Sequence, residues 1–418
     1  MKQEALLLVT ALTISSVLAC GAPRKPPAVA GNEDLPAHAV MVSYGLWSCE
    51  RGYLLRNRVC VPEKEAANES RFEVFGGPPP VIDEEAPPSR EERLSAMPGF
   101  AWDESDFPPR PIVEYPFSLD PANLSTVIGQ PTSYVVPEGQ TLYEAARHLG
   151  LGINQVALAF PDLDLLKPPV KPPANELDFP TWWVLPESDH QGLVINIPEM
   201  RIYYFVSPGA VVTYPVGLGR LDWRTPIERF RVIDKSVDPP WIIPASIQAE
   251  HVRERGDART MIPGGDPDNP LGHYRLRLDL PLYGIHGTNI PWGIGMQVTH
   301  GYVRLYPEDI ERLFEMVPRG TTGEFVYQPV KFGARGGEIY VEVLPDVYRT
   351  GFNYVAEAMR LLAAKGWSKA VDWDRLNSAL EEQRATPTRI SNGSSPLGPS
   401  HWPPIEARGA APPAIPPS

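Results

Sequence analysis

The sequence predicts a mostly β domain with short helices, preceded by a small α+β module and by proline-rich linkers. From Gly192 onward, short apolar runs repeat at the spacing of β-strands. Residues 131–187 carry a short strand followed by two helical segments. The chain holds 50 prolines in 418 residues, about twice the usual share of roughly 5%. Because they gather in the N-terminal third and the tail, those parts are expected to be linkers.

Length and charge limit the possible functions. A chain of 418 residues has room for two or three domains with a sizeable core. The net charge of -13 argues against nucleic acid as the main partner, because phosphate binding needs basic patches.

Residues 1–20 are typical of a secretory signal, with Lys2, an apolar run and small residues before Cys20. The end of this segment, Val17–Gly21, resembles a lipoprotein signal box. That resemblance implies that Cys20 is lipidated and becomes a membrane anchor; the alternative is an ordinary signal peptide with an incidental cysteine. In both cases we expect an exported, periplasmic protein.

The other two cysteines, Cys49 and Cys60, lie eleven positions apart. In an oxidising compartment such a pair favours a disulfide that closes a small loop. We therefore expect a linker over 21–43 and a disulfide module over 44–62. A Pro/Glu-rich linker over 63–130 and a disordered tail over 385–418 complete the non-globular parts.

Residues 350–384 are expected to form helices. Phe352, Val355, Met359 and Leu362 repeat at helical spacing, and Leu376 and Leu380 mark a shorter helix. The repeat favours packing helices, and a partner-binding helix is the alternative.

Residues 131–187 start with a strand near Tyr134, a turn, and a helix capped by Thr141. This pattern resembles a LysM module, a strand–helix–helix–strand fold. The resemblance implies binding of N-acetylglucosamine-containing glycan; a structural spacer is the alternative.

The stretch with the most candidate functional residues runs from Gly284 to Phe314. His286 and His300 are each followed by glycine, which permits close backbone approach to a ligand. Pro307 then predicts the start of a helix. Its first turn holds Glu308 and Asp309, and its apolar stripe holds Ile310, Leu313 and Phe314.

The stretch reads His-Gly-Thr from His286, a spacer, and then Thr299-His300-Gly301-Tyr302-Val303-Arg304. It resembles the signature of the L,D-transpeptidases, the YkuD-type cell-wall enzymes. The resemblance covers 192–344 and implies a YkuD-like β-sandwich or barrel. Tyr302 stands where the family has its nucleophilic cysteine. A milder departure is Thr225-Pro226-Ile227-Glu228, where the family has glycine in the last position, so a positive φ at Glu228 would strain the turn.

The resemblance also implies roles for the site residues. In the family a cysteine thiolate attacks a peptidoglycan stem peptide and D-alanine leaves. Here His300 would be the base, oriented by Thr299 or a nearby carbonyl, and the amides of Gly301 and Tyr302 would form the oxyanion hole. His286 would line the site, and Asn289 and Arg304 would bind substrate, Arg304 through a carboxylate.

Tyr302 is incompatible with the first of these steps. A phenol has a pKa of about 10 and ionises poorly near pH 7. Its oxygen also stands further from the backbone than a cysteine sulfur. Three hypotheses follow: a stem-peptide- or glycan-binding protein with impaired catalysis, an active L,D-transpeptidase that crosslinks peptidoglycan or attaches proteins to it, or a lipid-anchored peptidoglycan tether. No cofactor or metal is expected, because His286, His300 and Tyr302 lack a further ligand in a fitting motif.

Overall fold

The structure is a computed structural model that describes the backbone of residues 39–43, 46–49, 53–56, 59–62, 110–167, 175–281, 283–299 and 301–393. Side chains are described from residue 110 onward, except those of residues 246, 250, 254 and 255. The chain divides into two compact units, one of residues 1–40 and 47–71 and the other of residues 41–46 and 72–418.

Four short strands lie within residues 39–62. They are β1 (Ala39–Ser43), β2 (Leu46–Cys49), β3 (Tyr53–Arg56) and β4 (Val59–Pro62). Strands β3 and β4 pair in antiparallel fashion, with Leu54 opposite Val61. The predicted linker 21–43 is wrong at its end, because β1 begins at Ala39. Cys20 and the side chains of Cys49 and Cys60 lie outside the described part, so the lipid anchor and the disulfide stay predictions.

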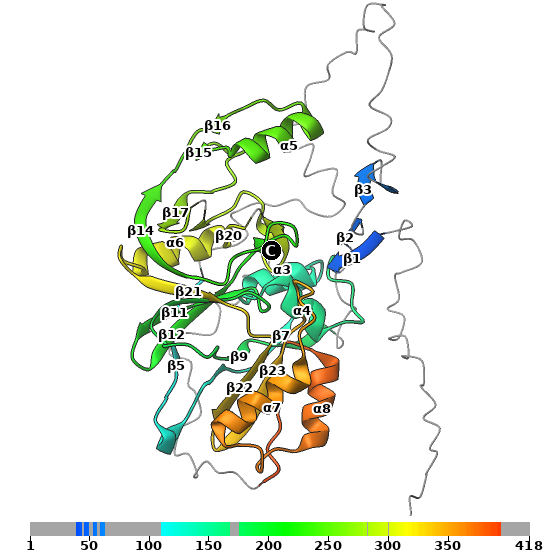
Figure 1. Cartoon of the computed structure of the whole chain (residues 1–418), viewed down its shortest axis with the longest axis vertical. Helices are drawn as coiled ribbons and strands as arrows, with labels where there is room; N and C mark the ends of the chain where they lie inside the picture. The colour runs from blue at the N-terminus through cyan, green and yellow to red at the C-terminus, as the bar shows by residue number, and fades with distance from the viewer. Residues whose placement is uncertain are drawn as a thin grey trace, which may run out of the picture. The chain divides into compact units, whose positions relative to one another are not determined.

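A nine-stranded sheet forms the centre of the larger unit (Figure 1). Its strands, in spatial order, are β20 (Val303–Arg304), β18 (Gly284–His286), β17 (Tyr274–Leu278), β14 (Arg229–Val237), β21 (Thr322–Val326), β10 (Gly192–Asn196), β11 (Arg201–Ser207), β12 (Ala210–Pro215) and β5 (Tyr115–Pro116). Two neighbouring pairs, β10–β21 and β18–β20, are parallel, and the others are antiparallel. This arrangement confirms the mostly β fold class with short helices.

Helix α6 (Pro307–Met316) packs against the apolar core of this sheet. It begins at Pro307 as predicted, and Ile310 and Leu313 are buried in that core beside strand residues such as Ile285. Burying each such side chain contributes roughly 1.5–3 kcal/mol. The helix therefore fixes the segment that precedes it, which carries Thr299 to Arg304.

The α+β module predicted over 131–187 has its described strands and helices between residues 127 and 184. It contains β6 (Val127–Gly129), β7 (Thr132–Val135), α3 (Leu142–His148), α4 (Ile153–Ala159), β8 (Glu176–Phe179) and β9 (Trp182–Val184). Strand β7 pairs with β8 in antiparallel fashion, and Thr141 caps α3 through a capping box with Glu144. The module shares one apolar core with the large sheet, in which Tyr143 and Trp183 meet Tyr203.

The predicted linker over 63–130 is wrong for residues 110–130. Strand β5 pairs with the outer edge of the sheet through β12, and β6 pairs with β9. Phe117, Val127 and Ile128 are buried. The high proline content of this segment had indicated a linker and not strands. An edge strand nevertheless tolerates proline, because one of its sides makes no ladder hydrogen bonds. Residues 63–109 lie outside the described part.

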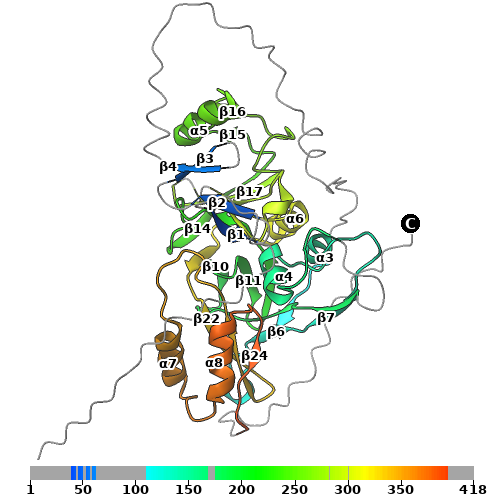
Figure 2. The same ribbon diagram turned by 90° about the vertical axis from the view of Figure 1, so that its right-hand side faces the viewer.

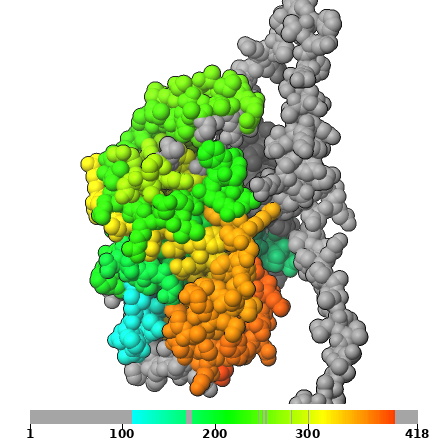
Figure 3. All heavy atoms as spheres, viewed as in Figure 1, coloured from blue at the N-terminus to red at the C-terminus, as the bar shows by residue number. Residues whose placement is uncertain are grey.

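A second sheet follows the large one. Strands β22 (Val330–Arg335), β23 (Glu338–Val343) and β24 (Thr388–Arg389) pair in antiparallel fashion. Helices α7 (Tyr354–Lys365) and α8 (Trp373–Glu382) lie side by side against it and close a separate core (Figure 2). The cyan segment near residue 120 lies beside this orange part (Figure 3), where the Thr126 N–H donates to the Ala334 carbonyl at 2.8 Å.

This second sheet corrects three predictions. The domain expected over 192–344 ends earlier, because β21 is the last strand of the large sheet along the chain, while β22 and β23 belong to the C-terminal core. Residues 385–393 are not a disordered tail, because β24 is paired and Ile390 is buried. In α7, Leu362 is buried as expected, but Val355 and Met359 are exposed, and Ala358 faces the core instead.

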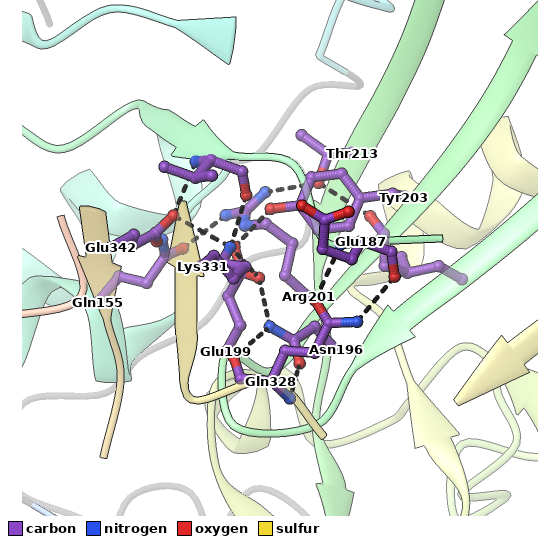
Figure 4. Close-up of polar contacts among 12 residues, drawn as sticks. Gln155, Glu187, Asn196, Glu199, Arg201, Tyr203, Thr213, Gln328, Lys331 and Glu342 are labelled. Atoms are coloured by element: carbon purple, nitrogen blue, oxygen red, sulfur yellow. Dashed lines mark hydrogen bonds and ion pairs between the residues drawn. The ribbon is translucent and has the colours of Figure 1, made fainter. Parts of the chain in front are cut away.

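A buried ionic cluster joins the module and both sheets (Figure 4). Lys331 Nζ donates to Glu199 Oε2 at 2.7 Å and to the Val184 carbonyl at 2.7 Å, and lies 3.0 Å from Glu342 Oε2. The side chains of Lys331, Glu199 and Glu342 have no exposed surface. Burial beside Glu199 raises the pKa of Glu342 to about 7.

The remaining elements are short. They are η3 (Pro121–Asn123), β13 (Leu218–Gly219), β15 (Trp241–Ile242), α5 (Ala245–Arg255), β16 (Met261–Ile262), η4 (Pro291–Gly293) and β19 (Gln297–Thr299). Within the described ranges, no helix combines the length and apolar character needed to span a bilayer.

Candidate active site

Three basic side chains form one row across neighbouring strands at the end of the sheet. Arg275 on β17 is paired with His286 on β18, and His286 is paired with Arg304 on β20. Because side chains alternate between the two faces of a strand, these three residues share a face. The intervening residues Leu276, Ile285 and Val303 are buried in the core on the opposite face.

His286 is a neutral imidazole with one unused acceptor. Its Nδ1 lies 2.7 Å from the Gly287 carbonyl oxygen, which can only accept, so the proton is assigned to Nδ1. Nε2 is buried and has no hydrogen-bond partner among the described residues. Burial lowers the pKa of His286 to about 3, and the charge of Arg304 acts in the same direction. The imidazole therefore presents a lone pair and no positive charge near pH 7.

Tyr302 lies beside this imidazole. The two ring centroids are 5.7 Å apart and the ring planes meet at 65°, an edge-on arrangement. Burial raises the pKa of the Tyr302 phenol, and the positive charges of Arg275 and Arg304 offset this only in part. The hydroxyl therefore stays protonated near pH 7.

The turn that carries Tyr302 is held by two threonine hydroxyls. Thr299 Oγ1 donates to the Tyr302 carbonyl at 2.7 Å and accepts from the Gly301 N–H at 3.2 Å. Thr225 Oγ1 donates to the Gly301 carbonyl at 3.2 Å and accepts from the Gly219 N–H at 3.2 Å. The Gly301 N–H, expected in an oxyanion hole, is thus used inside the turn. The function of Thr225 was missed because its partner lies 76 positions along the chain.

Gly301 itself is required by the backbone. Its φ is +98°, a conformation that side chains with a Cβ rarely adopt. A Cβ placed there would lie 2.8 Å from Cε1 of Tyr283. Glu228, by contrast, is not among the described residues with positive φ. The predicted strain at Glu228 is therefore absent.

The two guanidinium groups of the row lack anionic partners. The Nε atom of each guanidinium is buried and has no hydrogen-bond partner among the described residues, and neither side chain forms an ion pair with a described residue. Burial lowers the pKa of Arg304 to about 10 and also lowers that of Arg275. Sequence reasoning missed Arg275, although its place on the strand before His286 was a usable signal.

Asn289, an expected substrate-binding residue, is not joined to the row. Asn289 Nδ2 donates to the Pro267 carbonyl at 3.1 Å, so its amide holds a neighbouring loop. His300, the expected base, lies outside the described residues. In the parts of the chain that the structure describes, no three His, Cys, Asp or Glu side chains are grouped as a metal site would require.

Helix α6 is tied to the α+β module by buried ion pairs. Glu308 accepts two hydrogen bonds from Arg147 on α3, from Nε and Nη2, each at 2.9 Å. Asp309 pairs with Arg110. The side chains of Arg147 and Glu308 are 3% and 6% exposed, so this pair excludes water. The module therefore sets the position of the helix that follows the Tyr302 turn.

Known proteins resemble this chain over the same region. The L,D-transpeptidase catalytic domain (YkuD) matches residues 190–331. The chain is 38% identical over 290 residues to the probable L,D-transpeptidase YbiS of Escherichia coli K12, a match over 67% of this chain and 92% of YbiS. It is 32% identical over 292 residues to the probable L,D-transpeptidase ErfK/SrfK of Salmonella typhimurium, over 67% and 92% of the two chains. Because YbiS is 38% identical and is matched over 92% of its length, the chain belongs to the L,D-transpeptidase family.

Proposed function

We propose that this protein binds peptidoglycan stem peptides at the His286 site and has lost the cysteine-dependent step of transpeptidation. The single observation that carries this proposal is the phenol ring of Tyr302 packed edge-on against the imidazole of His286. Burial raises the pKa of the phenol and lowers that of the imidazole, so both are expected to be neutral near pH 7. By the family pattern, that position holds the nucleophile.

The chemistry of the two side chains supports the loss. A thiol has a pKa of about 8.5, which a nearby imidazole lowers further, so a thiolate forms near neutral pH. The Tyr302 phenol starts at a pKa of about 10, and burial raises it. His286, with a pKa of about 3, is too weak a base to remove its proton.

The scaffold around Tyr302 supports retained binding. The turn is held by Thr299 and Thr225, and α6 is fixed by the core and by the Arg147–Glu308 pair. The half-buried guanidinium groups of Arg275 and Arg304 have buried Nε atoms without partners among the described residues. Leaving such atoms unsatisfied is costly, and a bound anion would relieve that cost.

The proposal is tested by D-alanine release from tetrapeptide muropeptides, followed by mass spectrometry. The native protein is compared with Tyr302→Cys and with Tyr204→Cys, a control that places a thiol at a half-buried tyrosine on β11. We expect release by Tyr302→Cys alone, because only that thiol stands at the nucleophile position.

Release by the native protein would contradict the proposal and favour the active-transpeptidase hypothesis. Release by none of the three would show that the site has changed beyond residue 302. Binding to insoluble peptidoglycan without release by any variant would then favour the tether.

We further propose that the protein is exported, is anchored through a lipid at Cys20, and binds glycan through the LysM-like module of residues 131–187. The signal-like N-terminus supports the first two points, and the paired β7 and β8 flanking α3 and α4 support the third. Cell fractionation of native protein and Cys20→Ala tests the anchor. Loss of membrane association in Cys20→Ala is the expected result, and equal association of both would refute it.

A further inference from the structure

We propose that Arg275, Arg304 and His286 together form a receptor for the C-terminal residue of a peptide. In this receptor the two guanidinium groups bind the terminal carboxylate, and His286 Nε2 accepts the N–H of the last peptide bond. The inference rests on the proposed function and names the part of the stem peptide that the site recognises.

The first argument is geometric. Arg275 is directly opposite His286 in the antiparallel β17–β18 pair, and Arg304 is level with His286 in the parallel β18–β20 pair. Cβ atoms of directly opposite residues lie about 4.5–5.5 Å apart. The two guanidinium groups therefore lie on either side of one imidazole and can reach the same small ligand.

Gly284 provides space for Arg275. An added Cβ at Gly284 would lie 3.3 Å from Arg275 Nε and 3.8 Å from Nη2, so the guanidinium lies against this part of β18. A larger residue at Gly284 would displace the guanidinium. The placement of Arg275 thus depends on a second residue of the same site.

The second argument is the unused hydrogen-bonding capacity. Arg275 Nε, Arg304 Nε and His286 Nε2 are all buried, and none has a partner among the described residues. His286 is 1% exposed. Buried charged groups in native proteins are paired in the great majority of cases, because an unpaired one is costly. These three atoms therefore indicate a ligand that supplies acceptors for two of them and a donor for the third.

The third argument concerns local charge. The charge of Asp234 acts on Arg275, but its carboxylate pairs with Arg319 at 2.8 Å and approaches Arg277 at 4.0 Å. Tyr302 and His286 are neutral near pH 7. The row thus carries two positive charges without a compensating carboxylate in the described residues. A ligand carboxylate would supply that compensation.

These requirements select the ligand. A carboxylate matches the planar fork of a guanidinium, and a pair of arginines can hold both of its oxygens. Acetate satisfies the arginines but offers no N–H to His286 Nε2. The terminal residue of a peptide offers both groups, and the Tyr302 hydroxyl adds a further donor. Tyrosine at residue 302 thus fits a binding site better than a hydrolytic or transfer site.

The test is calorimetric titration of the full chain with a stem tetrapeptide, with the same peptide as its C-terminal amide, and with inorganic phosphate. Each titration is repeated with Arg275→Gln and with the matched control Arg277→Gln. Arg277 lies two residues along β17 on the same face, and its side chain is 54% exposed. The control thus removes the same charge from the same strand outside the row.

We expect the amide to bind the native protein at least tenfold more weakly than the acid. Arg275→Gln should weaken acid binding about tenfold or more, because the charge-assisted hydrogen bonds from its guanidinium to the carboxylate are lost. Arg277→Gln should change it less than twofold. Arg275→Gln should melt no lower than the native protein, since it removes a half-buried cation that has no anionic partner among the described residues; a purely structural role for Arg275 would lower the melting temperature.

Equal binding of acid and amide, or unchanged binding in Arg275→Gln, would overturn this inference while leaving stem-peptide binding intact. Phosphate binding as tight as the tetrapeptide would also overturn it, because the site would then recognise charge alone. Absence of any tetrapeptide binding by the native protein would overturn both this inference and the proposed function.

Discussion

Replacing Lys331 with methionine leaves two buried carboxylates without their cation. Lys331 Nζ lies 2.7 Å from Glu199 Oε2 and 3.0 Å from Glu342 Oε2, and all three side chains are fully buried. Methionine preserves most of the apolar stem of lysine, so the change removes charge and hydrogen bonds more than volume. Removing one partner of a buried ion pair destabilises proteins by about 3–5 kcal/mol.

Urea unfolding at pH 8, followed by tryptophan fluorescence, measures this loss. We expect Lys331→Met to lower the free energy of unfolding by about 3–5 kcal/mol. The control is Lys365→Met, which breaks an ion pair with Glu187 whose two side chains are 23% and 50% exposed. Such pairs contribute roughly 0–1 kcal/mol.

The loss in Lys331→Met should be smaller at pH 5, where a carboxyl group of the cluster can take up a proton and lose its charge. If Lys331→Met lowers the free energy of unfolding at pH 8 no more than Lys365→Met does, the cluster is not a set of buried ion pairs that excludes water between the two sheets.

Three further predictions test other parts of the account. Glu342 has a pKa raised to about 7, so the stability that it contributes is present below its unfolded value of about 4.3 and is lost as pH rises through 7. Relative to native protein, Glu342→Gln should therefore gain about 2 kcal/mol in unfolding free energy between pH 5 and pH 8; parallel pH profiles in urea would contradict this. Gly301→Ala should lose about 1–3 kcal/mol, because φ is +98° and the new Cβ would press on Tyr283; an unchanged urea midpoint would exclude that strain. Arg147→Leu should lose about 3 kcal/mol or more by leaving Glu308 buried without its partner, and a loss below about 1 kcal/mol would mean that water reaches the pair.

Local patterns predicted local structure well. The helix capped by Thr141 and the helix beginning at Pro307 were both indicated by residues within one turn of the helix. The apolar stripe of α6 was equally clear, because Ile310 and Leu313 follow helical spacing on a helix with one buried face. Such features depend on neighbours three or four residues away.

Contacts between distant segments were not predictable. Glu308 was interpreted only through the helix dipole, but its partner Arg147 lies 161 residues earlier. In α7, helical spacing alone could not show which face meets β22 and β23, and Val355 and Met359 are exposed. Periodicity gives the type of an element, while its orientation depends on what covers it.

The candidate site shows the same division. The family motif located His286, Tyr302 and Arg304, but Arg275 joins them only through strand pairing. Its single signal in the sequence was a basic residue on the strand before His286. Without the register of β17 against β18, that residue could not be distinguished from the exposed Arg277.

Acylation at residue 302 tests the central claim most directly. Intact-protein mass spectrometry after incubation with a tetrapeptide substrate would detect an acyl group, because thiolate attack forms a thioester while D-alanine leaves as the amine. We expect Tyr302→Cys to gain the mass of the acyl tripeptide, located to residue 302 by peptide mapping, and the native protein to gain none. An acyl adduct on the native protein, at any residue, would contradict the loss of nucleophilic catalysis.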